Sequence, residues 1–256
     1  MDTDGVHGST PAGSLFLRLP GSPTCSSGRG WPAAPVLADG VPTPAFLELL
    51  EHGGPKEEAT ADVGVGMPTS RQASLSLLEG VTAEGDTALH VLATNGDGAR
   101  YLSSADVIYR KARHLLYKVN NNGDTPLHCA ARAGRSCMVS RLIALARGDD
   151  DGAGERLREL VRTENGSKET ALHDAVRIGS GHIVELLMAA DSELACFPKS
   201  GGASALQLAV LHDLDDIADT LYQKSGGYLS YSGPDGQNAL HAAALRSHGN
   251  THRILR

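Results

Sequence analysis

The strongest constraint on this chain is a six-residue phrase that recurs five times after residue 84. The phrase reads GDTALH, GDTPLH, KETALH, GASALQ and GQNALH, at residues 85–90, 123–128, 168–173, 202–207 and 236–241. Its third position falls at residues 87, 125, 170, 204 and 238, so the last two steps are equal and the first two are longer. A repeat of this spacing predicts a stack of similar units, because each unit can bury its apolar face only against its neighbours.

Each position of the phrase has a structural reason. The Thr or Ser at the third position can cap a helix by accepting backbone N–H bonds, and Pro126 suits a first turn, where the N–H has no intrahelical partner. Six residues after the histidine, Gly96, Gly134 and Gly179 are expected to end the helix in the left-handed conformation. A second apolar helix follows at matching offsets. The residues assigned to the structural repeat motif are Thr87, Leu89, His90, Thr125, Pro126, Leu127, His128, Thr170, Leu172, His173, Leu206, Leu240 and His241.

The phrase and its period resemble the T-P-L-H-x-A signature of ankyrin repeats. The resemblance implies an all-α fold, an ankyrin-repeat solenoid of about five helix-turn-helix repeats with hairpin loops. The repeats start near residues 85, 123, 168, 202 and 236, the last one is incomplete, and the domain covers 71–256. The two longer steps predict insertions around residues 101–117 and 147–162, the second containing a helix at 155–161.

Within this family, residues 78–86, 122–131 and 164–173 are similar to the plant accelerated-cell-death type. That type typically continues with more repeats and a C-terminal membrane segment, and it is associated with defence and cell-death signalling. This chain stops at Arg256, inside the second helix of its last repeat, and contains no run of 18 or more apolar residues, so we expect no membrane span. An uncapped last repeat is expected to fray and to expose Ile254 and Leu255. We therefore expect that the protein self-associates through this end or that the sequence is a fragment.

Composition separates residues 1–70 from the rest of the chain. They hold nine of the twelve prolines and eleven of the thirty glycines. Such a segment buries too little apolar surface to offset chain entropy, so residues 1–70 are predicted to be a disordered Gly/Pro-rich leader. A short helix is expected at 44–52, with Thr43 as its cap and Gly53 as its end. The leader has no credible secretory signal, and an organellar targeting segment is left open.

The net charge limits the class of partner, and the cysteine spacing limits the cellular compartment. The net charge of −7 disfavours a nucleic-acid binder, which usually carries a basic stripe. The four cysteines show no C-x-x-C spacing, which favours a reducing compartment. We therefore expect a cytoplasmic protein, or one held at the plasma membrane through its partners.

Four histidines at one position of the phrase raise the hypothesis of a metal site, but their spacing argues against one. Helices of neighbouring repeats stack ~8–10 Å apart, whereas zinc ligands must all reach within ~2.1 Å of one ion. Gln207 replaces the histidine in the fourth repeat, which a hydrogen-bonding role tolerates, so each histidine is expected to hydrogen-bond across its repeat. The acidic loop at 148–152 does not fit a calcium-binding loop, because Arg147 and Arg158 stand where ligands are needed. We expect no catalytic residue, no metal and no cofactor.

The leading hypothesis is therefore a non-catalytic scaffold that binds other proteins, set in plant defence or stress signalling by the resemblance. The alternative is a soluble truncated form of a membrane-anchored ankyrin defence regulator that competes for its partners, and an enzyme is disfavoured. Partner contacts are expected from exposed positions of the first helices and from the hairpins, where Tyr makes a good anchor. The candidate partner-binding residues are Thr94, Asn121, Arg132, Asp174, Arg177, Lys199, Tyr228 and Tyr231.

Overall fold

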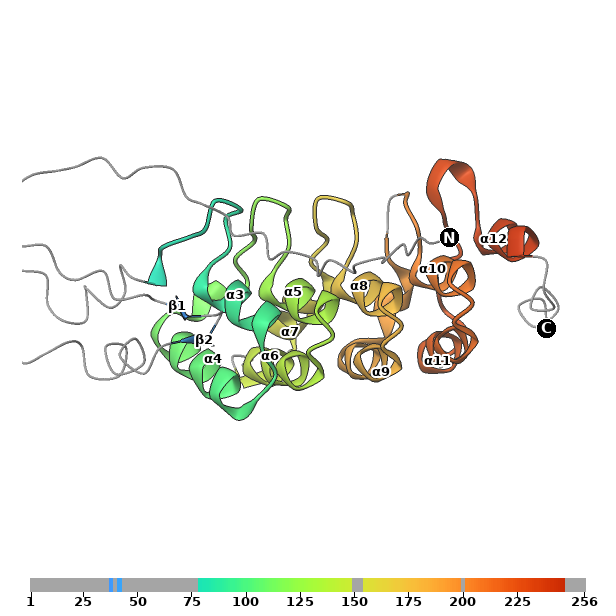
Figure 1. Ribbon diagram of the computed structural model, residues 1–256. Helices are drawn as coiled ribbons and strands as arrows, with labels where there is room; N and C mark the ends of the chain where they lie inside the picture. The colour runs from blue at the N-terminus through green and yellow to red at the C-terminus, as the bar shows by residue number, and fades with distance from the viewer. Residues whose placement is uncertain (1–36, 39–40, 43–77, 149–153, 199–200, 247–256) are drawn as a thin grey trace, which may run out of the picture. The chain divides into compact units, whose positions relative to one another are not determined.

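The computed structural model describes residues 37–38, 41–42, 78–148, 154–198 and 201–246 (Figure 1). The helix predicted at 44–52, the candidate contact Lys199 and the edge at 254–255 lie outside these residues, as does most of the predicted leader. Within residues 1–70, β1 (Leu37–Ala38) pairs antiparallel with β2 (Val41–Pro42), a pair that was not predicted. All described residues belong to one compact unit, 34–256.

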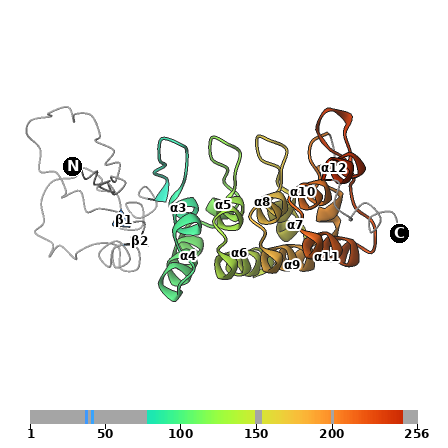
Figure 2. The ribbon, with the colours of Figure 1, turned by 45° about the vertical axis from the view of Figure 1, so that its right-hand side comes forward.

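Residues 78–246 form successive helix pairs that stack in two rows (Figures 1 and 2). In the first row α3 packs on α5, α5 on α8, α8 on α10 and α10 on α12, and in the second row α4 packs on α6, α6 on α9 and α9 on α11. Hairpin loops project from the first row. The predicted all-helical ankyrin-type solenoid is confirmed. Its helices are α3 (Ala88–Asn95), α4 (Ala99–Lys111), α5 (Pro126–Arg132), α6 (Ser136–Gly148), α7 (Glu155–Arg162), α8 (Ala171–Arg177), α9 (Gly181–Ala190), α10 (Ala205–Leu211), α11 (Asp215–Ser225) and α12 (Ala239–Arg246).

Two segments interrupt the regular alternation of helix pairs. The helix predicted at 155–161 is confirmed as α7, which packs against α6 and α9 and buries Leu157, Leu160 and Val161. In the first repeat, the long helix α4 is followed by a 3-10 helix, η1 (Arg113–Leu116), which accounts for the longer step between the first two copies of the phrase. Two further 3-10 helices, η2 (Ser192–Cys196) and η3 (Pro234–Gly236), lie in the later repeats.

The glycine after each first helix has two different structural reasons. Gly134 and Gly179 have φ values of 71° and 72°, in the left-handed region that costs glycine nothing. The same expectation for Gly96 is wrong, because its backbone is extended, with φ −159°. A Cβ at Gly96 would lie 2.3 Å from the ring of Tyr101, so this glycine is required by close packing.

Leucine and alanine fill the core between the two rows. Leu89, Leu127 and Leu172 of the repeated phrase are fully buried, and each contributes about 1.5–3 kcal/mol relative to an exposed side chain. Ala130 and Ala175 are also fully buried, and their small side chains let neighbouring first helices approach closely. Interfaces built this way need few aromatic side chains, which agrees with an aromatic content of 4%.

Candidate protein-interaction surface

Each histidine of the first two repeats bridges two repeats. The Nδ1 atom of His90 accepts a hydrogen bond from the backbone N–H of Thr87 at 3.2 Å, and the Thr87 hydroxyl lies 2.9 Å from the same atom. Because a backbone N–H can only donate, Nδ1 carries no proton and the proton of the neutral ring lies on Nε2. The Nε2 atom then donates to the backbone carbonyl of Asp124 in the next repeat, at 2.9 Å.

The second repeat has both hydrogen bonds of this arrangement, and the third has only the bond to Nδ1. His128 accepts from the backbone N–H of Thr125 at 3.1 Å and donates to the carbonyl of Glu169 at 3.1 Å. His173 accepts from Thr170 at 3.1 Å, but its Nε2 atom has no hydrogen-bond partner among the described residues. Both ring nitrogens of His90 and His128 are thus engaged in hydrogen bonds within the protein, and neither is left for a metal.

Burial sets the protonation state of these histidines. All three rings are fully buried, and burial lowers the pKa of His90 and of His128 and lowers that of His173 to about 4. A ring without charge is what the Nε2–H tautomer requires, so the hydrogen bonds and the desolvation agree. His90 and His128 thus join neighbouring repeats, and none of the three rings is exposed on the surface.

The hairpins of the first three repeats are joined by a second set of hydrogen bonds. The side-chain amide of Asn120 donates to the carboxylate of Asp86 at 2.7 Å, and that of Asn165 donates to Asp124 at 2.9 Å. The backbone N–H of Asn121 donates to the carbonyl of Glu84 at 3.0 Å, and the next hairpin repeats this bond from 166 to 122 at 2.8 Å. These bonds, together with those from the Nε2 atoms of His90 and His128, are called the hairpin ladder below.

The ladder also requires glycine in the hairpins. Gly123 has φ 78°, and a Cβ there would lie 2.7 Å from the backbone nitrogen of Gly166 in the next hairpin. Any other residue at this position would combine backbone strain with a collision. A Cβ at Gly85 would likewise lie 2.6 Å from Asn121 of the next hairpin, so the glycines of the first two repeats are explained by the close approach of successive hairpins.

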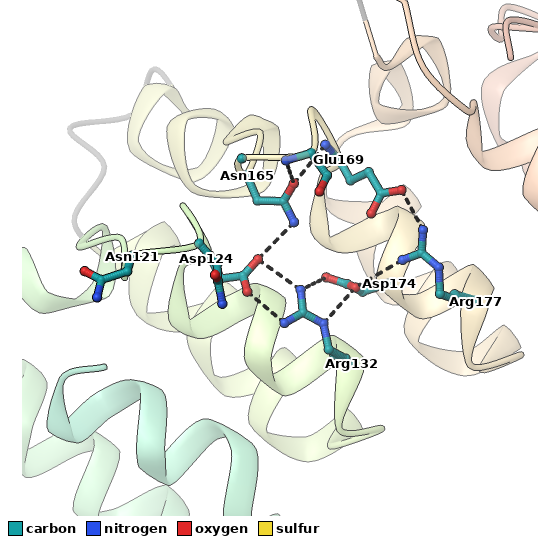
Figure 3. A pocket seen from close by; sticks show the side chains of 10 residues that line it. Asn121, Asp124, Arg132, Asn165, Glu169, Asp174 and Arg177 are labelled. Carbon is teal, nitrogen blue, oxygen red and sulfur yellow. Dashed lines mark hydrogen bonds and ion pairs between the residues drawn. The ribbon is translucent and has the colours of Figure 1, made fainter. Parts of the chain in front are cut away.

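A polar pocket of about 450 Å³ lies where the second and third hairpins meet α5 and α8 (Figure 3). Arg132 lies at its centre and bridges two carboxylates. Its guanidinium donates to Asp124 at 2.7 and 2.9 Å and to Asp174 at 3.0 and 3.1 Å. The pocket is lined by Asn121, Asn122, Asp124, Arg132, Asn165, Gly166, Ser167, Glu169, Asp174 and Arg177.

A second arginine closes the pocket on the side of the third repeat. Arg177 donates to Glu169 at 2.5 Å and lies 3.5 Å from Asp174 (Figure 3). Two guanidinium groups and three carboxylates therefore form one connected network across two repeats. Such a network fixes the side chains that line the pocket, because Arg132, Arg177, Asp124 and Asp174 are each held by two partners.

The two carboxylates that share Arg132 differ in pKa. Burial raises the pKa of Asp174, and its hydrogen bonds to Arg132 do not fully offset this effect. Burial also opposes ionisation of Asp124, but hydrogen bonds from Arg132 and Asn165 outweigh it and hold the pKa of Asp124 below its ordinary value. The additional amide bond from Asn165 distinguishes the two sites. The hydrogen bond to Asp124 is the main reason that the pKa of Arg132 is raised.

The structure brings some of the candidate partner-binding residues together and separates others. Asn121, Arg132, Asp174 and Arg177 all line the pocket. The expectation that Asp174 is exposed is wrong, because its side chain is only 2% exposed beneath Arg132. The contact role of the exposed residues remains a proposal.

The remaining candidates lie elsewhere on the repeats. Thr94 is exposed at the end of α3, where its hydroxyl donates to the carbonyl of His90. Tyr228 is 81% exposed and Tyr231 is 45% exposed, in the segment between α11 and α12. Leu240 and Leu245 of α12 are also exposed, and self-association through this end remains a prediction.

Sequence reasoning missed the residues that build the pocket floor. Asp124, Asn165 and Glu169 stand out in the sequence only as parts of the hairpins. One signal was present, because Asp86 and Asp124 occupy the same position of the phrase and Asn120 and Asn165 each stand five positions before the capping threonine. A polar side chain that recurs at one register position indicates a contact between repeats.

Comparison with known proteins agrees with this architecture. A family model described as "Ankyrin repeats (3 copies)" matches residues 69–151. The chain is 35% identical over 101 residues to an ankyrin repeat-containing protein of Arabidopsis thaliana, an alignment that covers 39% of this chain and 18% of that protein. It is 30% identical over 124 residues to the nuclear factor NF-kappa-B p105 subunit of Mus musculus, covering 48% of this chain and 12% of that protein.

The chain thus spans less than a fifth of the length of these relatives. The narrower resemblance to the plant accelerated-cell-death type remains a prediction. None of the described helices combines the length and apolar character needed to cross a bilayer.

Proposed function

Since the chain carries ankyrin repeats, which bind other proteins, we propose that it is a non-catalytic interaction scaffold in plant defence or stress signalling. The similarity to an Arabidopsis protein supports a plant setting, and the resemblance to the accelerated-cell-death type supports the defence role. We place the scaffold in the cytoplasm, or at the plasma membrane through its partners.

The observation that carries the proposal is the pocket between the second and third hairpins. Its floor is fixed by the network around Arg132, and its rim is formed by hairpins that the ladder holds in register. A surface that is ordered before binding loses less conformational entropy when a partner docks. The surface of repeats two and three around this pocket, called the inner face below, is therefore the part of the molecule best prepared to bind a polypeptide.

Affinity capture from plant extract tests this assignment with a matched pair of charge reversals. Arg177→Glu alters the pocket, whereas Arg100→Glu makes the same change on the exposed face of α4. Arg132 is avoided, because its removal would leave Asp124 buried without a counter-ion and Asp174 with only its longer contact to Arg177. Circular dichroism first establishes that both variants keep the helix content of the wild type.

We expect Arg177→Glu to lose partners that the wild type and Arg100→Glu both retain. The same partner set for all three proteins would contradict binding at the inner face. The identity of the partners tests the setting: a set without any defence or stress component would contradict that part of the proposal.

A further inference from the structure

We infer that the pocket between the second and third hairpins takes an acidic side chain, a carboxylate, of an extended partner segment. This inference rests on the proposed function, because it names the chemistry of the partner at the same inner face. Two observations support it: the exposed charged groups of the pocket are guanidinium groups, and some of their N–H donors have no partner among the described residues.

The exposed charge in the pocket is cationic. The side chains of Arg132 and Arg177 are 46% and 41% exposed, whereas Asp124 and Asp174 are each 2% exposed. Glu169 is intermediate, at 17%. The carboxylates of Asp124 and Asp174 are thus buried while the neighbouring guanidinium groups are half-exposed, so an approaching partner meets the guanidinium groups first.

The two arginines have N–H groups that make no hydrogen bond to the described residues. A guanidinium has five N–H groups and no acceptor. Hydrogen bonds to described residues use four of them at Arg132 and two at Arg177, so Arg177 is the main source of remaining donors. A carboxylate matches this fork of N–H groups and forms charge-assisted hydrogen bonds with it.

Neutral donors at the rim favour the same ligand. The side chains of Asn122 and Ser167 are exposed at the pocket, one on each of the two hairpins. An extended segment lying across these hairpins would meet an amide on one side and a hydroxyl on the other. Its acidic side chain would then reach the arginines below.

A basic side chain fits this pocket poorly. It would need accessible carboxylate oxygens, but those of Asp124 and Asp174 are buried and already accept bonds from Arg132. The exposed guanidinium groups would also repel it. Three carboxylates and two guanidinium groups leave one net negative charge, so the preference for an acidic side chain arises from short-range hydrogen bonds to the exposed arginines and not from a long-range field.

A random library of twelve-residue peptides provides the test. The library is selected in parallel against the full-length wild type, Arg177→Gln and Arg100→Gln, the last being the same charge change outside the pocket. Since the library contains no phosphate, an enriched acidic position reports a carboxylate. We expect the wild-type and Arg100→Gln pools to converge on peptides with one fixed Asp or Glu.

A selected peptide is then remade with Asn or Gln at its fixed acidic position. We expect this change to weaken binding to the wild type about tenfold, the effect of losing one charge-assisted bond, and to have less than about a twofold effect on Arg177→Gln. An equal loss for both proteins would overturn the inference.

Two further outcomes separate this inference from the proposed function. Pools without an acidic position, or with a fixed Lys or Arg, overturn the inference, while the proposed function stands if the same peptides lose binding to Arg177→Glu. Peptides that bind the wild type and Arg177→Glu equally well overturn both.

Discussion

The junctions within the first three repeats differ from the junction between the third and fourth. In the first two junctions a histidine, an asparagine and a backbone N–H each reach into the neighbouring hairpin. At the next junction the Nε2 atom of His173 has no partner among the described residues, although α8 still packs on α10. Apolar stacking and the hairpin ladder are therefore separate devices: stacking builds the array, and the ladder fixes the hairpins.

The sequence explains why the ladder stops. Lys199 stands where the earlier repeats have Asn120 and Asn165, so the amide donor is missing. Ala203 replaces the acidic residue at the position of Asp124, and Gln207 replaces the histidine. The fourth repeat thus keeps the apolar residues and the capping hydroxyl of the phrase, and lacks its acidic residue and its histidine.

The largest expected effect comes from removing the cation at the centre of the pocket. Arg132→Ala leaves the buried Asp124 without a counter-ion and the buried Asp174 with only its 3.5 Å contact to Arg177. It should lower the free energy of unfolding by about 2–4 kcal/mol, less than for a fully buried pair because half of the guanidinium is in water. Urea unfolding measures this change. As a control, Arg141→Ala breaks the ion pair between α6 and Asp106 of α4. This change should lower the free energy of unfolding by less than about 1 kcal/mol. Equal losses for the two variants would contradict the role assigned to Arg132.

Acidification should weaken the array through its buried histidines. The pKa of His173 is about 4 in the folded state, below its ordinary value, so the unfolded state binds more protons as the pH falls below about 6.5. Stability is therefore complete above about pH 6.5 and is lost as the pH falls toward 4. His173 alone should account for about 2 kcal/mol between pH 7 and pH 5.

Urea unfolding at both pH values, for the wild type and for His173→Gln, checks this linkage. Glutamine is suitable because Gln207 occupies the aligned position of the fourth repeat. The variant should show a smaller loss of stability on acidification, and an undiminished pH dependence would count against the linkage.

A smaller effect separates the two kinds of junction directly. His128 and His173 are both fully buried, so His128→Ala and His173→Ala create similar cavities. Only His128 makes a hydrogen bond to the next repeat, and its removal should cost about 1 kcal/mol more than that of His173. Urea unfolding of the two variants measures this difference. A loss of unfolding free energy in His173→Ala that equals or exceeds the loss in His128→Ala would contradict the role of the ladder.

The fold could be predicted from the sequence because its determinants are local and repeated. Capping threonines, Pro126 and the leucine stripe each favour a helix within one repeat, and the period places the repeats beside one another. The insertion helix α7 was predicted because the longest step between copies of the phrase left room for it. Gly96 was predicted incorrectly, because its requirement comes from the ring of Tyr101 and not from the local turn.

The candidate site was predicted only in part. Arg132, Arg177 and Asn121 were identified as exposed positions, but the sequence does not show that Arg132 covers Asp174. That burial depends on which side chains of two repeats meet, and this is decided by packing across the junction. The pairing of Asn165 with Asp124 was missed for the same reason, since the hydrogen bond between them joins two neighbouring repeats.

Native-state hydrogen exchange tests most directly whether the ladder makes the first three repeats the stable part of the array. The amides of α5, α8 and the hairpins at Asn121 and Gly166 should exchange most slowly, because opening them breaks both apolar contacts and ladder bonds. The amides of α10 and α12 should exchange faster, since α12 is held to α10 by a separate small apolar cluster and, among the described residues, α10 lacks the histidine bond that would tie it to α8. Uniform protection from α3 to α12, or slower exchange in α10 and α12 than in α5 and α8, would contradict the account.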